Sequence, residues 1–290
     1  MSTAKSSFSA RPTEVSSLST PKGITDINTI SAFLSSPTQP FDFDDLANTV
    51  YVLIGSAILP TLEATFQHIS LCQQPVTLLL AGGIGHSTSL LYAAVSRHHR
   101  YSSIYEQIRG LPEAQVYKLI LLRFWPPLKS MLGDGRLRLL IDDRSTNCGA
   151  NAIESKKELE KEGMSPSRLV IIQDPTMHRR TLATFAKAFQ DDIQDKAMTL
   201  VPWSFYPELR LSEDGSLTWK IEGGNVDQVE TSHLWEPDRF ISLVMGEIPR
   251  IRDDKNGYGP KGAGYIAHVD IPEEVEKAWQ RLDKLISQRV

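Results

Sequence analysis

The chain has 290 residues, a formal net charge of −4 and a hydrophobic content of 41%. These values are ordinary for a globular protein, and without an excess of basic residues a nucleic-acid-binding protein is not expected. Cys72 and Cys148 are the only cysteines, which excludes a disulfide framework and favours a reducing, intracellular setting. No stretch reaches 18 apolar residues, so membrane insertion is not expected either.

Residues 1–22 are rich in Ser and Thr and carry one acidic residue, Glu14. This composition predicts a disordered tail on a cytoplasmic protein. The alternative is an organellar targeting segment, because such segments are basic, Ser-rich and poor in acids.

In chain order, a first helix is predicted over 24–34, where Ile27, Ile30 and Leu34 recur at helical spacing. Short apolar runs then alternate with helical patterns. The runs predict buried strands over 49–56, 75–83, 137–142, 168–173 and 197–203. The helices between and after them are predicted over 59–71, 87–98, 112–125, 147–162 and 175–190.

The last part of the chain is less regular. Residues 204–235 contain two Gly-rich turns and are predicted as a surface excursion. A helix over 236–248 follows, and an amphipathic helix over 272–286 ends the pattern. Between them lies a charged, glycine-rich loop over 249–264, whose length calls for a functional reason.

Continuously apolar strands that alternate with helices predict a parallel sheet covered on both faces, a Rossmann-like α/β fold of about five strands. We expect a single domain over 23–290, with a core at about 48–204 and a smaller, mainly helical accessory part at about 205–290. The carboxyl ends of parallel strands share one edge of the sheet, where ligands of open α/β sheets bind. Polar loops follow most of the strands, so this edge is the predicted site.

The loop after the second strand reads AGGIGHST. Gly82 and Gly83 permit backbone angles and close approaches that a Cβ forbids. Ser87 and Thr88 open a helix whose free amides favour an anion. The third glycine and the later acid of a dinucleotide fingerprint are missing, so a tight turn and a ligand-binding loop both remain open.

The loop after the third strand, DDRSTNCGAN, is more polar than helix capping requires. Asn147 or Thr146 is enough to cap the next helix. The remaining polar side chains therefore favour ligand binding: Asp142, Asp143, Arg144, Ser145 and Asn151. Cys148 is a candidate nucleophile without a base placed by the sequence, so a small buried side chain is the preferred interpretation.

In QDPTMHRR, after the fourth strand, Asp174 and Thr176 are further capping candidates. Arg179 and Arg180 lie in the first turns of the helix. A cation there interacts unfavourably with the helix dipole, which costs about a few tenths of a kcal/mol or more. An anionic ligand or a carboxylate partner would offset this cost. His178 is either a general acid or base or a surface histidine.

Two further patterns predict no site. GYGPKGAG (257–264) lacks the Gly-Lys-Ser/Thr ending of a phosphate-binding loop and does not follow a strand. The seven histidines contain no HExxH, and the adjacent His98 and His99 are expected to face different ways on a helix. No metal site is therefore predicted.

Several of these stretches together resemble the YdcF-like proteins, of the group named for ElyC and SanA, whose domain is formally of unknown function. The resemblance is carried by LAGGIGHST, PEA (112–114), DDRSTNCGANA, QDPTMHRRTLATF and GEIPRIRDDKNGYGPKG, and it covers the chain from about Ile24 to the last helix. It implies a nucleotide-binding-like α/β domain with S-adenosyl-L-methionine as the associated ligand and no settled reaction. The implied site comprises Gly55, Ser56, Gly82, Gly83, Ile84, Gly85, His86, Ser87, Glu113, residues 143–147, Asn151 and residues 174–180.

The chain departs from that group at two points. Met177 stands three residues before Arg180, where the group tends to have a histidine, and His178 is shifted by one position. Any catalysis that needs this histidine is thereby in doubt. The membrane-anchoring N-terminus of the envelope-associated relatives is also missing, so an envelope role is not expected.

Three functions follow as hypotheses. The first is binding of S-adenosyl-L-methionine, with Asp143 or Glu113 near the ribose or sulfonium and Arg179 or Arg180 on the carboxylate. In ordinary methyltransferases an acid at the end of the second strand holds the ribose hydroxyls. The second predicted strand of this chain ends in Gly-Gly instead, so a standard methyltransferase is not supported. The second is an enzyme, for example a hydrolase, that acts on a phosphorylated or anionic small molecule with His178 or Glu113 as acid or base. The third is a non-catalytic ligand sensor.

Whichever ligand binds, the 249–264 loop is expected to fold over the binding edge. Asp253 and Tyr258 are its predicted ligand contacts.

Overall fold

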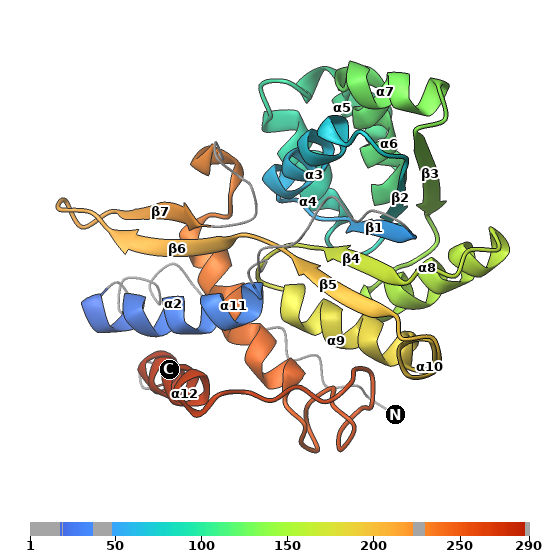
Figure 1. Cartoon of the computed structure of the whole chain (residues 1–290). Helices are drawn as coiled ribbons and strands as arrows, with labels where there is room; N and C mark the ends of the chain where they lie inside the picture. Colours follow the sequence, from blue (N-terminus) through green and yellow to red (C-terminus); the bar gives the residue numbers. More distant parts are fainter. Residues whose placement is uncertain (1–17, 19, 37–47, 223–229, 288–290) are drawn as a thin grey trace.

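Five parallel strands form the central sheet in the order β3-β2-β1-β4-β5 (Figure 1). The computed structural model describes residue 18 and residues 20–36, 48–222 and 230–287. The strands are β1 (Thr49–Ile54), β2 (Val76–Ala81), β3 (Leu137–Asp142), β4 (Arg168–Ile172) and β5 (Thr199–Trp203). The predicted Rossmann-like α/β fold is confirmed, and each predicted strand lies within two residues of its observed bounds.

The strand order places a topological switch between β1 and β4. From β1 the chain moves outward through β2 to β3, and it then crosses back to add β4 and β5 on the other side of β1. The loops after β1 and β4 therefore leave in opposite directions. A crevice opens at such a point in α/β sheets, which makes it the expected ligand position.

Helices cover both faces of the sheet (Figure 1). Side chains of β1 alternate between two apolar cores, with Tyr51 and Leu53 in one and Val50, Val52 and Ile54 in the other. The first core is closed by α3 (Leu59–Leu71), α4 (Thr88–Arg97), α6 (Glu113–Phe124) and α7 (Pro126–Gly133). The second is closed by α8 (Cys148–Lys161) and α9 (His178–Ala188).

A third apolar core holds the accessory part together. It joins α2 (Pro21–Ser35), α11 (Pro237–Ile251), α12 (Glu273–Ser287) and the antiparallel hairpin of β6 (Tyr206–Leu211) and β7 (Leu217–Glu222). The short elements η1 (Ser102–Ile104), α5 (Tyr105–Ile108), α10 (Gln190–Asp195) and η2 (Thr231–His233) complete the described structure. Helix α2 thus packs with the C-terminal elements, although it precedes β1 in the chain.

Two predictions about the accessory part need correction. The stretch predicted as a surface excursion contains the β6–β7 hairpin, whose Pro207 and Leu209 are buried. The sequence signal that was missed is the alternation of apolar and polar residues on both sides of the Asp214-Gly215 turn. The tail predicted over 1–22 is also too long, because Leu18 is buried in the third core and Thr20 caps α2 by accepting the Gly23 amide. Residues 1–17 and 19 lie outside the described residues.

Membrane insertion was not expected from the sequence. Within the described part of the chain, no helix combines the length and apolarity that a bilayer crossing requires.

Candidate functional site

A cavity of about 1000 Å³ opens at the carboxyl edge of the sheet, beside the switch between β1 and β4. Its wall is built from the loops after the strands, from α8, α9 and α11, and from residues 258–266. The structure brings most predicted site residues to this wall: Gly55, Ser56, Gly82, Gly83, Gly85, His86, Ser87, Glu113, Ser145, Thr146, Asn147, Asn151, Asp174, Arg180 and Tyr258.

Glu113 is a buried acid that lies beside the glycines following β2. It begins α6, and its main-chain amide donates to the Gly83 carbonyl. The carboxylate accepts a hydrogen bond of 3.0 Å from the Thr88 hydroxyl. Burial raises the pKa of Glu113, while hydrogen bonds from Thr88 and Ser87 lower it, and the net pKa stays above the ordinary value. The strand that ends in Gly-Gly therefore does have an acid beside it, supplied by a distant helix.

The glycines in these loops are required by protein neighbours. A Cβ on Gly55 would come within 2.1 Å of the Glu113 carboxylate, and one on Gly82 would meet the same side chain. Gly83 lies so close to the next loop that its Cβ would be 2.3 Å from the Ser145 carbonyl, to which its own amide donates. These glycines therefore serve the packing of loops and of Glu113, whatever the ligand.

Asp174 is the second buried acid of the cavity. Its Oδ1 caps the following turn by accepting the amide and hydroxyl of Thr176. Its Oδ2 accepts from the indole of Trp235 at 3.2 Å and from the hydroxyl of Ser56 at 3.4 Å. Burial raises the pKa of Asp174 against these hydrogen bonds. No basic side chain pairs with Glu113 or Asp174 among the described residues.

Arg180 has the carboxylate partner that its position in the helix demands. It donates to both oxygens of Glu247, from Nε at 2.6 Å and from Nη2 at 3.1 Å. Burial works against the charged guanidinium, but Glu247 raises the pKa of Arg180 above its ordinary range. Two of its five N–H groups are used in this pair, so others remain for a ligand in the cavity.

Three more cations line the cavity on the side of α9 and α11. Lys187 donates to the Gly264 carbonyl. Arg250 donates to the Gly246 carbonyl and lies 3.4 Å from Glu247. Arg239 is exposed, and within the described ranges it has no hydrogen bond or ion pair. The cavity therefore has unpaired acids at the sheet and cations along α9 and α11.

His178 and Arg179 do not reach the cavity. His178 is fully buried, and its Nε2 contacts the carbonyl of Ile171, so this nitrogen carries the proton. Burial lowers the pKa of His178 to about 4, which keeps the ring neutral. Arg179 turns the other way, donates to the Phe33 carbonyl and covers the Phe33 ring at 4.6 Å. Both side chains dock α9 onto its neighbours.

The remaining predicted residues also lie off the cavity wall. Asp143 accepts a hydrogen bond from Gln115 at 2.8 Å and does not line the cavity. Of the two acids predicted near the ribose or sulfonium, only Glu113 therefore faces the cavity. Ile84 is 53% exposed, and Thr176 is buried against Asp174. The loop predicted over 249–264 begins only after α11, which runs to Ile251, and Asp253 holds it together by accepting the Lys261 amide and pairing with His268. The loop does border the cavity, through Tyr258 and Gly264.

Asn147 and Cys148 form the start of α8 at the cavity. The Asn147 side chain caps α8 by accepting the Ala150 amide at 3.0 Å. The thiol of Cys148 is buried and lies 3.3 Å from the Thr181 hydroxyl and 3.6 Å from that of Thr184. Neither neighbour is a base, in keeping with the interpretation of Cys148 as a small buried side chain.

Sequence reasoning missed Glu247, Trp235, Lys187, Arg239 and Arg250. Glu247 and Arg250 lie within the GEIPRIRDDKNGYGPKG stretch but were not selected as site residues, whereas the other three follow no motif. Helix α11 brings Arg239, Glu247 and Arg250 to the cavity only because it packs across α9. No family model matches the chain. The resemblance to YdcF-like proteins thus rests on its sequence motifs alone.

Proposed function

We propose that the cavity binds a small adenosyl- or nucleotide-like molecule, with S-adenosyl-L-methionine as the first candidate. The observation that carries this proposal is the separation of charge across the wall. Glu113 and Asp174 are acids without a basic partner, and Arg180 and Arg239 are cations on the opposite elements. A ligand with a cationic sulfonium and a distant carboxylate suits this arrangement.

The sulfonium would lie near Glu113, where a buried carboxylate interacts strongly with a positive charge. The methionine carboxylate would accept hydrogen bonds from Arg239 and from the free N–H groups of Arg180. The apolar part of the wall, which includes Ile58, Leu90 and Trp235, suits an adenine ring. A transfer reaction is compatible with this arrangement, and the acceptor is left open.

The second candidate is an enzyme acting on a phosphorylated or anionic molecule. Lys187, Arg239 and Arg250 would hold the anion, and Glu113, whose pKa is raised, would serve as acid or base. His178 has no part in this version because it is buried away from the cavity. The third candidate, a sensor, uses the same contacts without turnover.

Thermal unfolding with three ligands separates these candidates. S-adenosyl-L-methionine at a hundredfold excess over its dissociation constant should raise the melting temperature by roughly 5 to 10 °C. S-adenosylhomocysteine has the same adenosine and carboxylate but no sulfonium charge, so it should bind more weakly. Adenosine monophosphate presents a phosphate and no carboxylate. A shift with the monophosphate beside no shift with millimolar S-adenosyl-L-methionine would reject S-adenosyl-L-methionine as the ligand and favour the second candidate.

Variants then test the two ends of the ligand. Glu113→Gln should reduce the preference for S-adenosyl-L-methionine over S-adenosylhomocysteine, because only the former has the charge that Glu113 would meet. Arg239→Ala should weaken both ligands equally, since both have the carboxylate. Arg210→Ala is the matched control, because Arg210 is an exposed arginine on β6 that pairs with Glu208 outside the cavity. Product analysis with the bound ligand distinguishes a sensor from an enzyme.

A further inference from the structure

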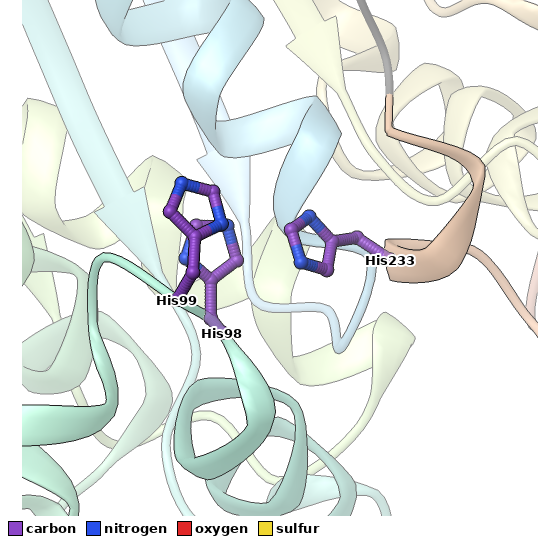
Figure 2. Close-up of side chains that lie close together, drawn as sticks. All are labelled: His98, His99 and His233. Carbon is purple, nitrogen blue, oxygen red and sulfur yellow. The ribbon is translucent and has the colours of Figure 1, made fainter.

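Three histidines that do not line the cavity lie close together (Figure 2). His98 and His99 follow α4 directly, and His233 ends the short helix η2. The two adjacent rings do not face different ways, as the sequence suggested, because α4 ends at Arg97 and His98 is already extended. Their centroids lie 4.7 Å apart, and the ring of His233 lies 4.1 Å from that of His98.

The group offers nitrogen ligands with acids beside them. One ring nitrogen from each histidine can be chosen so that all three lie within 4.8 Å of one another. Glu63 lies 3.5 Å from Nε2 of His98. Glu230 lies 3.7 Å from Nδ1 of His99 and 3.5 Å from Nε2 of His233. Two carboxylates thus flank three imidazoles.

The buried nitrogen of His98 is the observation that points to a ligand. His98 is 0% exposed, and its Nε2 makes no hydrogen bond of normal geometry within the described residues. Its nearest acceptor is the Glu63 carboxylate at 3.5 Å, too long for a good hydrogen bond, and a buried polar atom that is so poorly satisfied is costly and uncommon in folded proteins. Its environment of imidazoles and carboxylates is the one in which proteins hold transition metals.

We propose that His98, His99 and His233 bind one transition-metal ion of the Zn²⁺ class, with Glu63 or Glu230 as an oxygen ligand. Zinc holds nitrogen at about 2.0–2.1 Å in a tetrahedron, which sets ligand nitrogens about 3.3 Å apart. The trio must close by up to roughly 1.5 Å from its present spacing, and the stacked rings must rotate, because an ion lies in the plane of each imidazole that binds it. The side chain of His99 is 67% exposed and can turn with few contacts to break.

Such an ion would join two parts of the chain that are remote in sequence. The residues after α4 belong to the sheet domain, whereas η2 leads into α11 of the accessory part. Trp235 follows His233 by two residues, lines the cavity and donates to Asp174. Metal binding would therefore fix the segment that carries one wall of the cavity.

Cobalt binding to the untagged, chelator-treated full chain tests the proposal. Co²⁺ in a site of this kind gives visible d–d absorption, which Zn²⁺ should abolish on displacement. The expected result is one Co²⁺ per chain and a higher melting temperature with Zn²⁺. His98 is fully buried and its replacement risks misfolding, so His99→Ala and His233→Ala carry the test. Each should lower Zn²⁺ affinity at least tenfold.

His268→Ala is the control, because His268 is exposed and, within the described residues, forms ion pairs with Asp253 and Asp270 away from the three histidines. It should bind Zn²⁺ as the unaltered protein does. Absence of the d–d band would show that the three rings are an aromatic stack only, continued by Tyr101 at 4.2 Å from His98. The proposal is equally overturned if the folded His99→Ala and His233→Ala variants bind Zn²⁺ with unchanged affinity.

Discussion

The carboxylate of Glu113 occupies the space in which any side chain on residue 55 would have to lie. An ideal Cβ on Gly55 would approach Oε2 of Glu113 to 2.1 Å, far inside van der Waals contact. The glycine after β1 and the acid that begins α6 therefore form one structural unit. Through this unit, the cavity has a buried acid beside the ends of β1 and β2, two strands that contain no acidic residue.

Gly55→Ala should displace Glu113 and lower the free energy of unfolding by about 1–3 kcal/mol, the usual cost of overpacking. It should also weaken ligand binding, because the acid is moved. Urea unfolding and ligand titration measure the two effects. Gly133→Ala is the control, since nothing lies within 4 Å of its Cβ position and alanine favours the helix α7. Equal stability of both variants would show that Glu113 moves aside freely.

Glu113→Gln should change the pH dependence of stability in a defined direction. The folded-state pKa of Glu113 is raised from 4.5, so the folded protein holds a proton that the unfolded chain has lost. The resulting stabilisation is complete below the unfolded pKa and is lost as the pH rises through the folded pKa. In the variant this loss above about pH 4.5 should vanish. Urea midpoints measured across that range for both proteins check this, and parallel curves would contradict it.

Arg180→Ala should cost about 3–5 kcal/mol, because it leaves the buried carboxylate of Glu247 without its bidentate partner. Replacing both residues, as Arg180→Met with Glu247→Leu, should recover most of that stability. A double-mutant cycle by urea unfolding measures the coupling. The ligand shift must be compared at each variant's own baseline melting temperature. Additive effects of the two replacements would show that the pair contributes no coupling.

His178→Gln should flatten acid unfolding while leaving ligand affinity unchanged. The pKa of His178 is lowered from 6.5 to about 4 in the fold. Its contribution is present above pH 6.5 and is lost as the pH falls toward 4, by about 3 kcal/mol at roughly 1.4 kcal/mol per pKa unit. Glutamine keeps a donor for the Ile171 carbonyl. A large loss of affinity at neutral pH in the folded variant would instead mean that His178 acts in the site.

Asp253→Ala should weaken ligand binding through the loop that carries Tyr258. Asp253 accepts the Lys261 amide at 2.6 Å and so holds together this loop, which borders the cavity through Tyr258. Asp270→Ala is the matched control, because Asp270 contacts the same His268 but is 99% exposed and holds no loop amide. Isothermal titration of both variants measures the difference. Indistinguishable affinities would show that the loop serves packing only.

The site is only partly visible in the sequence. Glu113 could be selected because Pro112 and an acid mark a helix start, and Asn147 because it precedes a helix. His178 and Arg179 sit in the same polar loop as Arg180, yet they point into the core and toward Phe33. Side chains on successive helical residues point about 100° apart, so a polar cluster cannot be assigned to one face without the packing.

By itself, the sequence determined the five strands of the central sheet, most of the long helices and the parallel arrangement, although it missed the β6–β7 hairpin. Those properties depend on the spacing of apolar residues and on the residues that form turns, both of which are features of short stretches of sequence. The tertiary structure decided the strand order, the pairing of Arg180 with Glu247 and the meeting of His233 with His98 and His99. These contacts join residues far apart in the chain. They depend on how whole elements pack against one another, for which no short stretch of sequence carries a signal.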